Sequence, residues 1–257
     1  MGKIRVDQLL VKRGLVKSRE TAQRLILAQK ILVNGLPAQK PSQHVSEDAS
    51  MEVLEGMRYA SRGGLKLEAA LEAFKIDVEG RIAVDIGAST GGFTDCLLRR
   101  GAKKVYAVDV GYGQFAWKLR EDPRVIILER TNARYLTAGQ FPDPIEIAVI
   151  DVSFISALKI LEPLAKITEE AVVLLKPQFE AGPKDVPRGG VIRDPAIHRK
   201  VLEDFFTRLQ RWKPVGLIES PVPGTSGNRE FLVHLKGTIF EGMPEEELQK
   251  KIQELTH

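Results

Sequence analysis

The sequence of 257 residues predicts an α/β protein with a mostly parallel sheet, preceded by a small α+β domain. Three observations lead to this prediction. First, the apolar run at residues 82–86 opens into a glycine-rich turn and then a helical pattern, the strand–loop–helix order of parallel sheets. Second, further apolar runs of strand length follow, separated by segments long enough for crossovers. Third, the first 58 residues differ from the rest in their short helices and basic charge.

The composition is that of an ordinary globular protein, with 43% hydrophobic and 28% charged residues. No stretch approaches the roughly 20 apolar residues of a membrane span, and the N-terminus lacks the apolar core of a signal peptide. We therefore expect a cytoplasmic protein with no membrane partner. The single cysteine, Cys96, excludes an internal disulfide and offers no cysteine cluster for zinc, so we expect no metal site.

The first predicted domain covers residues 1–58 and opens with two helices. Residues 5–12 place apolar side chains at helical spacing, and Ser18 is a good N-cap for a second helix. Residues 31–35 then indicate a short strand that runs into an Asn-Gly turn, and a further strand is expected at 51–54.

The whole excess of positive charge lies in this first domain. Residues 1–58 hold 10 Lys and Arg against 6 Asp and Glu, whereas the remainder holds 28 of each. A compact basic patch suits a phosphate backbone, although a solvated charged face is the open alternative.

The order R-x-D-x-L-L, S-R-x-x-A and V-N-G resembles the S4-like RNA-binding domain. In that family two helices present basic side chains to structured RNA, where such contacts position the protein without reading sequence. The RNA-binding residues implied by the resemblance, with one more at the start of the second domain, are Arg5, Lys17, Arg19, Arg24 and Arg62.

The second predicted domain follows a linker at residues 59–63 and covers residues 64–257. Residues 178–194 form a long loop with three glycines and three basic side chains, and loops of this length are usually functional or mobile. Strands are expected at 82–86, 104–110, 125–128, 145–150, 171–175, 215–219 and 229–235, and helices at 66–75, 93–100, 195–212 and 244–257.

The glycine turn reads D-x-G-x-x-x-G-G, which fits neither the G-x-G-x-x-G of nicotinamide and flavin sites nor the P-loop. An acid, Asp85, in place of the first glycine suits a ligand with a cationic end, such as the amino group and sulfonium of S-adenosylmethionine. Asp109, at the end of the next strand, is placed to bind ribose hydroxyls. Asn132 could contact the adenine edge, with a simple turn role as the equal alternative.

These features resemble the class I, Rossmann-like methyltransferases. The resemblance implies a mostly parallel seven-stranded sheet with helices on both faces, and S-adenosylmethionine as the cofactor. The cofactor-binding residues it implies are Asp85, Gly87, Ala88, Ser89, Gly91, Gly92, Phe93, Asp109, Val110 and Asn132.

The chemical class of the methyl acceptor can be inferred from sequence motifs near the catalytic rim. Exocyclic amines are commonly methylated at an Asn/Asp-Pro-Pro-aromatic turn, but residues 151–154 read Asp-Val-Ser-Phe. Carbon methylation of pyrimidines commonly needs a cysteine at the rim, and the sequence places none there. A ribose hydroxyl instead needs a base to take its proton, which favours a lysine held neutral among charged neighbours.

Four charged residues lie next to the predicted catalytic rim: Lys66, Asp151, Lys176 and Glu230. Their settings, G-G-L-K-L, V-I-D-V-S-F, L-L-K-P and N-R-E-F, resemble the Lys-Asp-Lys-Glu tetrad of the FtsJ/RrmJ-type 2′-O-ribose methyltransferases. With the N-terminal domain and the glycine turn, the whole chain resembles the TlyA (haemolysin A) family.

The resemblance implies 2′-O-methylation of ribosomal RNA, free or in ribosomal subunits, at cytidine. By that likeness Lys176 is the general base, Asp151 holds it, and Lys66 with Glu230 positions the ribose. Asp151 and Lys176 could also form a structural ion pair. The alternative functions are a haemolysin or pore-former, and a catalytically silent RNA-binding protein; the sequence gives no sign of an obligate protein partner.

Overall fold

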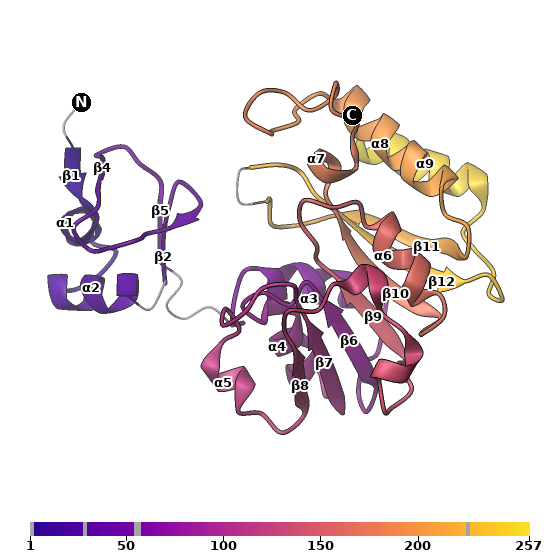
Figure 1. The fold of residues 1–257 in the computed structure, drawn as a ribbon. Coiled ribbons are helices and arrows are strands. Elements are labelled where there is room, and N and C mark those ends of the chain that lie inside the picture. Colours follow the sequence, from indigo (N-terminus) through magenta and orange to yellow (C-terminus); the bar gives the residue numbers. More distant parts are fainter. Residues whose placement is uncertain (1–2, 28–29, 54–57, 225–226) are drawn as a thin grey trace. The chain divides into compact units, whose positions relative to one another are not determined.

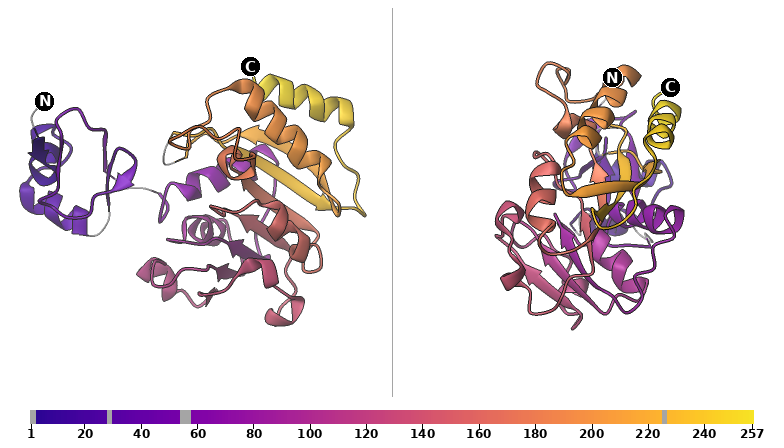
Figure 2. Two further views of the ribbon diagram at one scale, coloured as in Figure 1. Left: turned by 45° about the horizontal axis from the view of Figure 1, so that its top comes forward. Right: turned by 90° about the vertical axis from the view of Figure 1, so that its right-hand side faces the viewer.

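The structure is a computed structural model that describes residues 3–27, 30–53, 58–224 and 227–257. The chain divides into two compact units, of which the second comprises Arg58–Gly224 and Asn228–His257. Both units are drawn in Figures 1 and 2.

The first unit contains two helices on two small antiparallel sheets. One sheet pairs β1 with β4, and the other has the strand order β3-β2-β5. The helices and strands are β1 (Lys3–Arg5), α1 (Val6–Lys12), α2 (Arg19–Leu27), β2 (Ile31–Val33), β3 (Leu36–Pro37), β4 (His44–Ser46) and β5 (Met51–Val53). The predicted Leu54 lies outside the described residues.

Local sequence signals account for the turns of this unit. Ser18 Oγ accepts a hydrogen bond from the Thr21 amide at 3.2 Å, as expected of an N-cap. Asn34 and Gly35 have positive φ angles of 50° and 78°, the backbone that a two-residue hairpin turn requires. Both predictions are confirmed.

The second unit is built on a seven-stranded sheet with the order β11-β12-β10-β9-β6-β7-β8. Only β12 runs opposite to the other six strands, so the predicted mostly parallel sheet is confirmed. Its strands are β6 (Ile82–Ile86), β7 (Lys104–Val108), β8 (Val125–Leu128), β9 (Ile147–Ile150), β10 (Glu170–Leu175), β11 (Trp212–Glu219) and β12 (Phe231–Gly237).

Helices cover both faces of the sheet (Figure 2). Alternate residues of the strands enter two separate cores: Val84 belongs to the core that includes residues of α6, α8 and α9, whereas Ala83 belongs to the core that includes residues of α3 and α4. The helices are α3 (Gly63–Ala73), α4 (Gly92–Arg99), α5 (Trp117–Arg120), α6 (Leu158–Leu164), α7 (Pro177–Glu180), α8 (Pro195–Thr207) and α9 (Glu245–Leu255), with short 3₁₀ turns η1 (Ala133–Tyr135) and η2 (Ala138–Gln140).

Several predicted bounds differ by a few residues from those of the structure, and two differences have a clear physical cause. The helix expected at 195–212 ends at Thr207, because the buried Trp212 already belongs to β11 and its indole N–H donates to the Leu161 carbonyl at 2.9 Å. The segment expected to be a linker is packed into the second unit. Tyr59 is 2% exposed, its hydroxyl donates to Glu68 at 2.8 Å, and its ring fills the space where a Cβ on Gly64 would lie.

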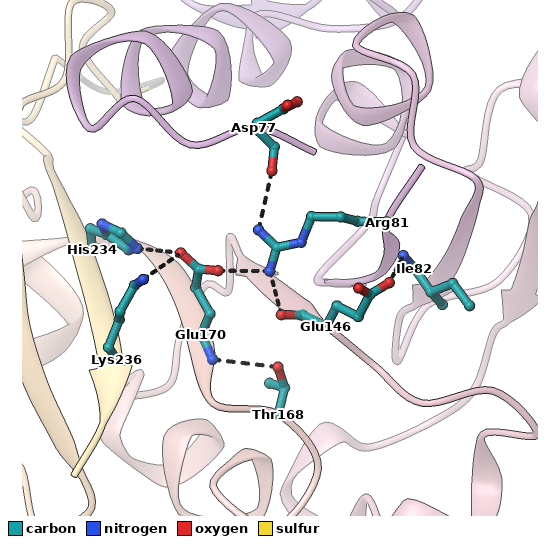
Figure 3. Close-up of polar contacts among 8 residues, drawn as sticks. All are labelled: Asp77, Arg81, Ile82, Glu146, Thr168, Glu170, His234 and Lys236. Carbon is teal, nitrogen blue, oxygen red and sulfur yellow. Dashed lines mark hydrogen bonds and ion pairs between the residues drawn. The ribbon is translucent and has the colours of Figure 1, made fainter. Parts of the chain in front are cut away.

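A partly buried ionic cluster ties the strands together at the amino edge of the sheet (Figure 3). Glu170 accepts from Arg81 Nη2 at 2.7 Å and lies 2.8 Å from His234 Nε2. Arg81 Nη2 also donates to the Glu146 carbonyl at 2.6 Å. Burial would raise the pKa of Glu170, but the hydrogen bonds from His234 and Arg81 outweigh it and hold that pKa at about 2. This cluster fixes the register of four strands at the edge opposite the glycine turn.

Candidate active site

Candidate residues follow the ends of four parallel strands. Because β6, β7, β9 and β10 run in the same direction, their carboxyl ends meet at one edge of the sheet, where α/β proteins bind their ligands. The residues that follow these strands are Gly87, Asp109, Asp151 and Lys176.

A cavity of about 390 Å³ opens at this edge. Among the predicted site residues, its lining includes Gly87, Ser89, Asp109, Val110, Asn132 and Asp151. The lining residues that sequence reasoning did not assign are Ile86, Val108, Gln114, Thr131, Ala133, Val152, Ser153, Phe154, Ile155 and Ile160.

The glycine turn forms the floor of this cavity. Gly87 has a φ of 82°, and a Cβ there would come within 2.4 Å of the Asp151 backbone oxygen. Asp109 holds the turn from the neighbouring strand, since its two carboxylate oxygens accept from the amides of Ser89 at 2.7 Å and Gly111 at 2.6 Å. The turn is therefore so tight that any side chain at Gly87 would collide with the backbone of Asp151.

Four predicted cofactor residues lie outside the lining of this cavity. Gly91 has a φ of 91° and abuts Leu119, while a Cβ on Gly92 would overlap Ser61. Ala88 and Phe93 are buried, at 5% and 3% exposure. The physical reason is that the turn passes directly into α4, which packs against α3, so these positions serve helix packing.

Asp85 also lies beneath the cavity and does not line it. Its side chain is fully buried, and Thr94 Oγ1 donates to Oδ2 at 2.6 Å. Burial raises the pKa of this carboxyl group to about 7. Within the described residues Oδ1 has no hydrogen-bond partner, so one buried polar atom under the turn is left unsatisfied.

Asn132 takes the turn role that was its alternative. Its side-chain oxygen accepts from the Arg134 amide at 3.1 Å and so caps η1, although the residue also lines the cavity.

Lys176 and Asp151 form an ion pair at the rim. Lys176 Nζ lies 2.6 Å from Asp151 Oδ1 and donates a hydrogen bond to Ser153 Oγ at 2.9 Å. The lysine side chain is only 10% exposed, so its charged end is held in place beside the cavity.

Lys66 and Glu230 form a second, more deeply buried ion pair. Lys66 Nζ donates to Glu230 Oε2 at 2.5 Å, and the two side chains are 10% and 3% exposed. The strand register brings this pair next to the first one. Because Leu175 pairs with Phe231 in the antiparallel β10–β12 ladder, Lys176 and Glu230 follow as the next opposed positions. The four residues of the predicted tetrad thus form two ion pairs at one edge.

Phe154 is the most unusual residue that sequence reasoning did not assign. It has a φ of 64°, which is rare for an aromatic residue, and is 90% exposed at the mouth of the cavity. Its ring centre lies 5.0 Å from that of Phe179, whose ring in turn lies 5.9 Å from Lys176 Nζ. The sequence signal was the D-V-S-F segment directly after β9.

The predicted RNA-binding residues differ in their surroundings. Asp7 is fully buried and accepts from Arg5 at 2.8 and 2.9 Å, Arg19 at 3.2 Å and Gln23 at 3.1 Å. Hydrogen bonds from Arg5 hold the pKa of Asp7 far below its usual range. Arg5 and Arg19 are therefore structural ligands of Asp7, although Arg19 is still half exposed.

The other three predicted RNA-binding residues differ in their exposure. Lys17 and Arg24 are exposed on the first unit. Arg62 is half-buried in the second unit, where it immediately precedes α3.

The described residues include neither a group of possible metal ligands nor a helix of membrane-spanning character. No group of three or more His, Cys, Asp or Glu side chains in this part of the chain could hold a metal ion. No helix in it is long and apolar enough to cross a membrane.

Comparison with known proteins gives matches over nearly the whole chain. The family model described as FtsJ-like methyltransferase matches residues 59–237, and the S4 domain matches residues 4–53. The chain is 48% identical to the 16S/23S rRNA (cytidine-2′-O)-methyltransferase TlyA of Mycobacterium tuberculosis, over 90% of this chain and 89% of that protein.

Two further relatives carry a different name. Hemolysin A of Brachyspira hyodysenteriae is 43% identical over 90% of this chain and 99% of that protein. A solved structure of a protein from Streptococcus thermophilus, also named a hemolysin, matches with a TM-score of 0.77 at 43% identity, over 99% of this chain and 96% of that one.

Proposed function

The chain belongs to the TlyA family of FtsJ-like methyltransferases, and from this premise we propose that it transfers a methyl group from S-adenosylmethionine to a ribose 2′-hydroxyl of ribosomal RNA. The relative from Mycobacterium tuberculosis is named for methylation at cytidine, and we propose the same nucleotide here. Such a substrate would place the enzyme in the cytoplasm.

The observation that carries the proposal is a group of two adjacent lysine–carboxylate ion pairs at the carboxyl edge of the sheet. The pair of Lys66 and Glu230 is deeply buried and so expensive to form, and the pair of Lys176 and Asp151 is partly buried beside the cavity. Asp151 belongs to both the cavity lining and the pair with Lys176, so the cavity and the charged groups form one site.

The cavity suits the cofactor. Gly87 lets the turn approach the Asp151 backbone closely, and the carboxylate of Asp109 still has lone pairs to accept from ribose hydroxyls after binding two amides. Asn132 and Val110 line the side of the cavity beyond Asp109. When bound, S-adenosylmethionine supplies an electrophilic methyl group on its sulfonium.

The tetrad residues provide the acid–base chemistry. Lys176, in its neutral form, takes the proton from the 2′-hydroxyl and so makes the oxygen nucleophilic. Asp151 and Ser153 hold the amine in position, and Asp151 stabilises the ammonium that results. Lys66 on α3 and Glu230, which immediately precedes β12, orient the ribose. The exposed ring of Phe154 offers an aromatic face of the kind that unstacked RNA bases pack on.

Replacement of Asp109 by alanine is expected to weaken S-adenosylmethionine binding by about 1.5 to 3 kcal/mol, since it removes a charged hydrogen-bond acceptor and also frees the Ser89 amide. Isothermal titration calorimetry measures the change. Asp204→Ala, which removes an exposed carboxylate from α8, is the matched control and should bind the cofactor like the wild type. If the two variants bound S-adenosylmethionine with equal affinity, Asp109 would not be a cofactor-binding residue.

The acceptor atom can be tested on the RNA itself. Ribosomal subunits from cells that lack the protein should gain one methyl group on a ribose, and mass spectrometry of the digested RNA locates it. An RNA fragment that carries a 2′-deoxynucleotide at that position should then accept no methyl group. Methylation of the deoxy fragment would show that the acceptor is a base atom, and the proposed chemistry would be wrong.

The two alternative functions make different predictions. A catalytically silent RNA-binding protein would bind RNA but give no methyl transfer with labelled S-adenosylmethionine. A pore-former would lyse erythrocytes in the absence of RNA and cofactor. The buried tetrad favours the methyltransferase, because neither alternative has a use for it.

A further inference from the structure

We infer that the loop between α7 and α8, residues 181–194, contains a binding site for a backbone phosphate of the RNA, next to the ribose that is methylated. The inference rests on the proposed function and extends it to a part of the substrate. We call this segment the arginine loop; it leaves α7 and returns to the start of α8 (Figure 1).

A second cavity, separate from the one at the glycine turn, supports this inference. It has a volume of about 390 Å³ and is formed by the arginine loop and the start of α8. Both Arg188 and Arg193 line it. A guanidinium group presents a planar fork of donors that matches a phosphate, and two of them around one hollow form a site for an anion.

The hollow carries a net positive charge, because two arginines and one carboxylate, Asp194, line it. Within the described residues neither Arg188 nor Arg193 makes an ion pair. Asp194 caps α8 by accepting from the Ala196 amide at 2.9 Å, and the nearby Asp185 pairs with Lys200 at 2.8 Å. The two guanidinium groups therefore have donors left for an anion.

The part of the loop between the two arginines is held in place. Asn228, only 3% exposed, accepts from the Ile192 amide and donates to the Gly190 carbonyl, both at 2.9 Å. Ile192 itself is 2% exposed and anchors the loop. Because these residues are already positioned, less ordering is needed when a ligand arrives, which favours affinity.

The same asparagine places the loop near the tetrad. Asn228 precedes Glu230 by two residues, a span of at most about 7 Å. Its backbone carbonyl accepts from the Gly224 amide at 2.9 Å, and a Cβ on Gly224 would lie 2.4 Å from Glu230 Oε1. The fixed part of the loop thus adjoins the group that orients the ribose, so the bound phosphate belongs to the strand that carries the target.

The test uses the full-length double variant Arg188→Gln/Arg193→Gln and ribosomal subunits from cells that lack the protein. The slope of log KM for the subunits against log salt concentration should fall by about one, because one phosphate contact is lost, and KM at 50 mM salt should rise about tenfold. Calorimetry should give an unchanged affinity for S-adenosylmethionine.

The control variant Lys166→Gln/Arg211→Gln removes two exposed charges at the amino edge of the sheet and should keep the wild-type slope. Wild-type values for the Arg188→Gln/Arg193→Gln variant would overturn the inference, as would a loss confined to kcat, which would mean that the loop only supports Glu230. Absence of methylation by the wild type on every RNA would instead overturn the proposed function, so the two failures are distinguishable.

Discussion

Replacement of Lys176 by alanine is expected to lower the turnover number by roughly 10² to 10⁴, because it removes the group that takes the proton in the transition state. The affinity for S-adenosylmethionine should change little, since Lys176 does not line the cavity beside the glycine turn. Single-turnover methylation of ribosomal subunits measures the first quantity and calorimetry the second.

Replacement of Lys176 by arginine distinguishes a role in proton transfer from a role as a positive charge. Lys176→Arg keeps a cation opposite Asp151 but cannot give up its proton at any ordinary pH, so turnover should stay as low as in the alanine variant. The matched control is Lys159→Ala, which removes an exposed lysine from α6. Full activity of the arginine variant would mean that Lys176 acts only as a positive charge, and the base would have to be another group.

The sequence predicted the elements whose signals are local. The predicted bounds 82–86 and 125–128 coincide with those of β6 and β8, because a charged residue or a glycine flanks each apolar run on both sides. Residues 155–170 received no prediction, and the structure places α6 there. That helix depends on a distant group, since Glu180 accepts from the Ala157 amide at 2.7 Å and so caps its start. Such contacts leave no periodic trace in the sequence.

In the candidate site, too, contacts between residues far apart in the chain could not be predicted from the sequence. Each tetrad residue could be assigned to a strand end or helix from its neighbours, but the pairing of Lys66 with Glu230 follows from strand register and helix packing. In the first unit the resemblance to the S4-like domain implied that Arg5 and Arg19 face RNA, whereas Asp7 binds both from inside the fold. The order of residues therefore predicted which basic positions matter but not the buried carboxylate that holds two of them.

Replacement of Glu230 by alanine is expected to destabilise the second unit by about 3 to 5 kcal/mol, because it leaves the Lys66 ammonium buried without its partner. For a unit of this size each kcal/mol corresponds to roughly 2 to 4 °C in Tm, so the transition should fall by roughly 6 to 20 °C. Differential scanning calorimetry measures it. Glu254→Ala, which breaks an exposed pair with Lys250, is the control and should shift Tm little.

A double replacement then separates stability from function. Lys66→Met/Glu230→Leu removes both charges and fills their space with apolar groups, so most of the lost stability should return. Methylation should not return, because the proposed function gives both residues the task of orienting the ribose. The stable double variant should still bind S-adenosylmethionine, since neither residue lines that cavity. If it methylated ribosomal subunits at the wild-type rate, the buried pair would be purely structural and the reaction would depend on Lys176 and Asp151 alone.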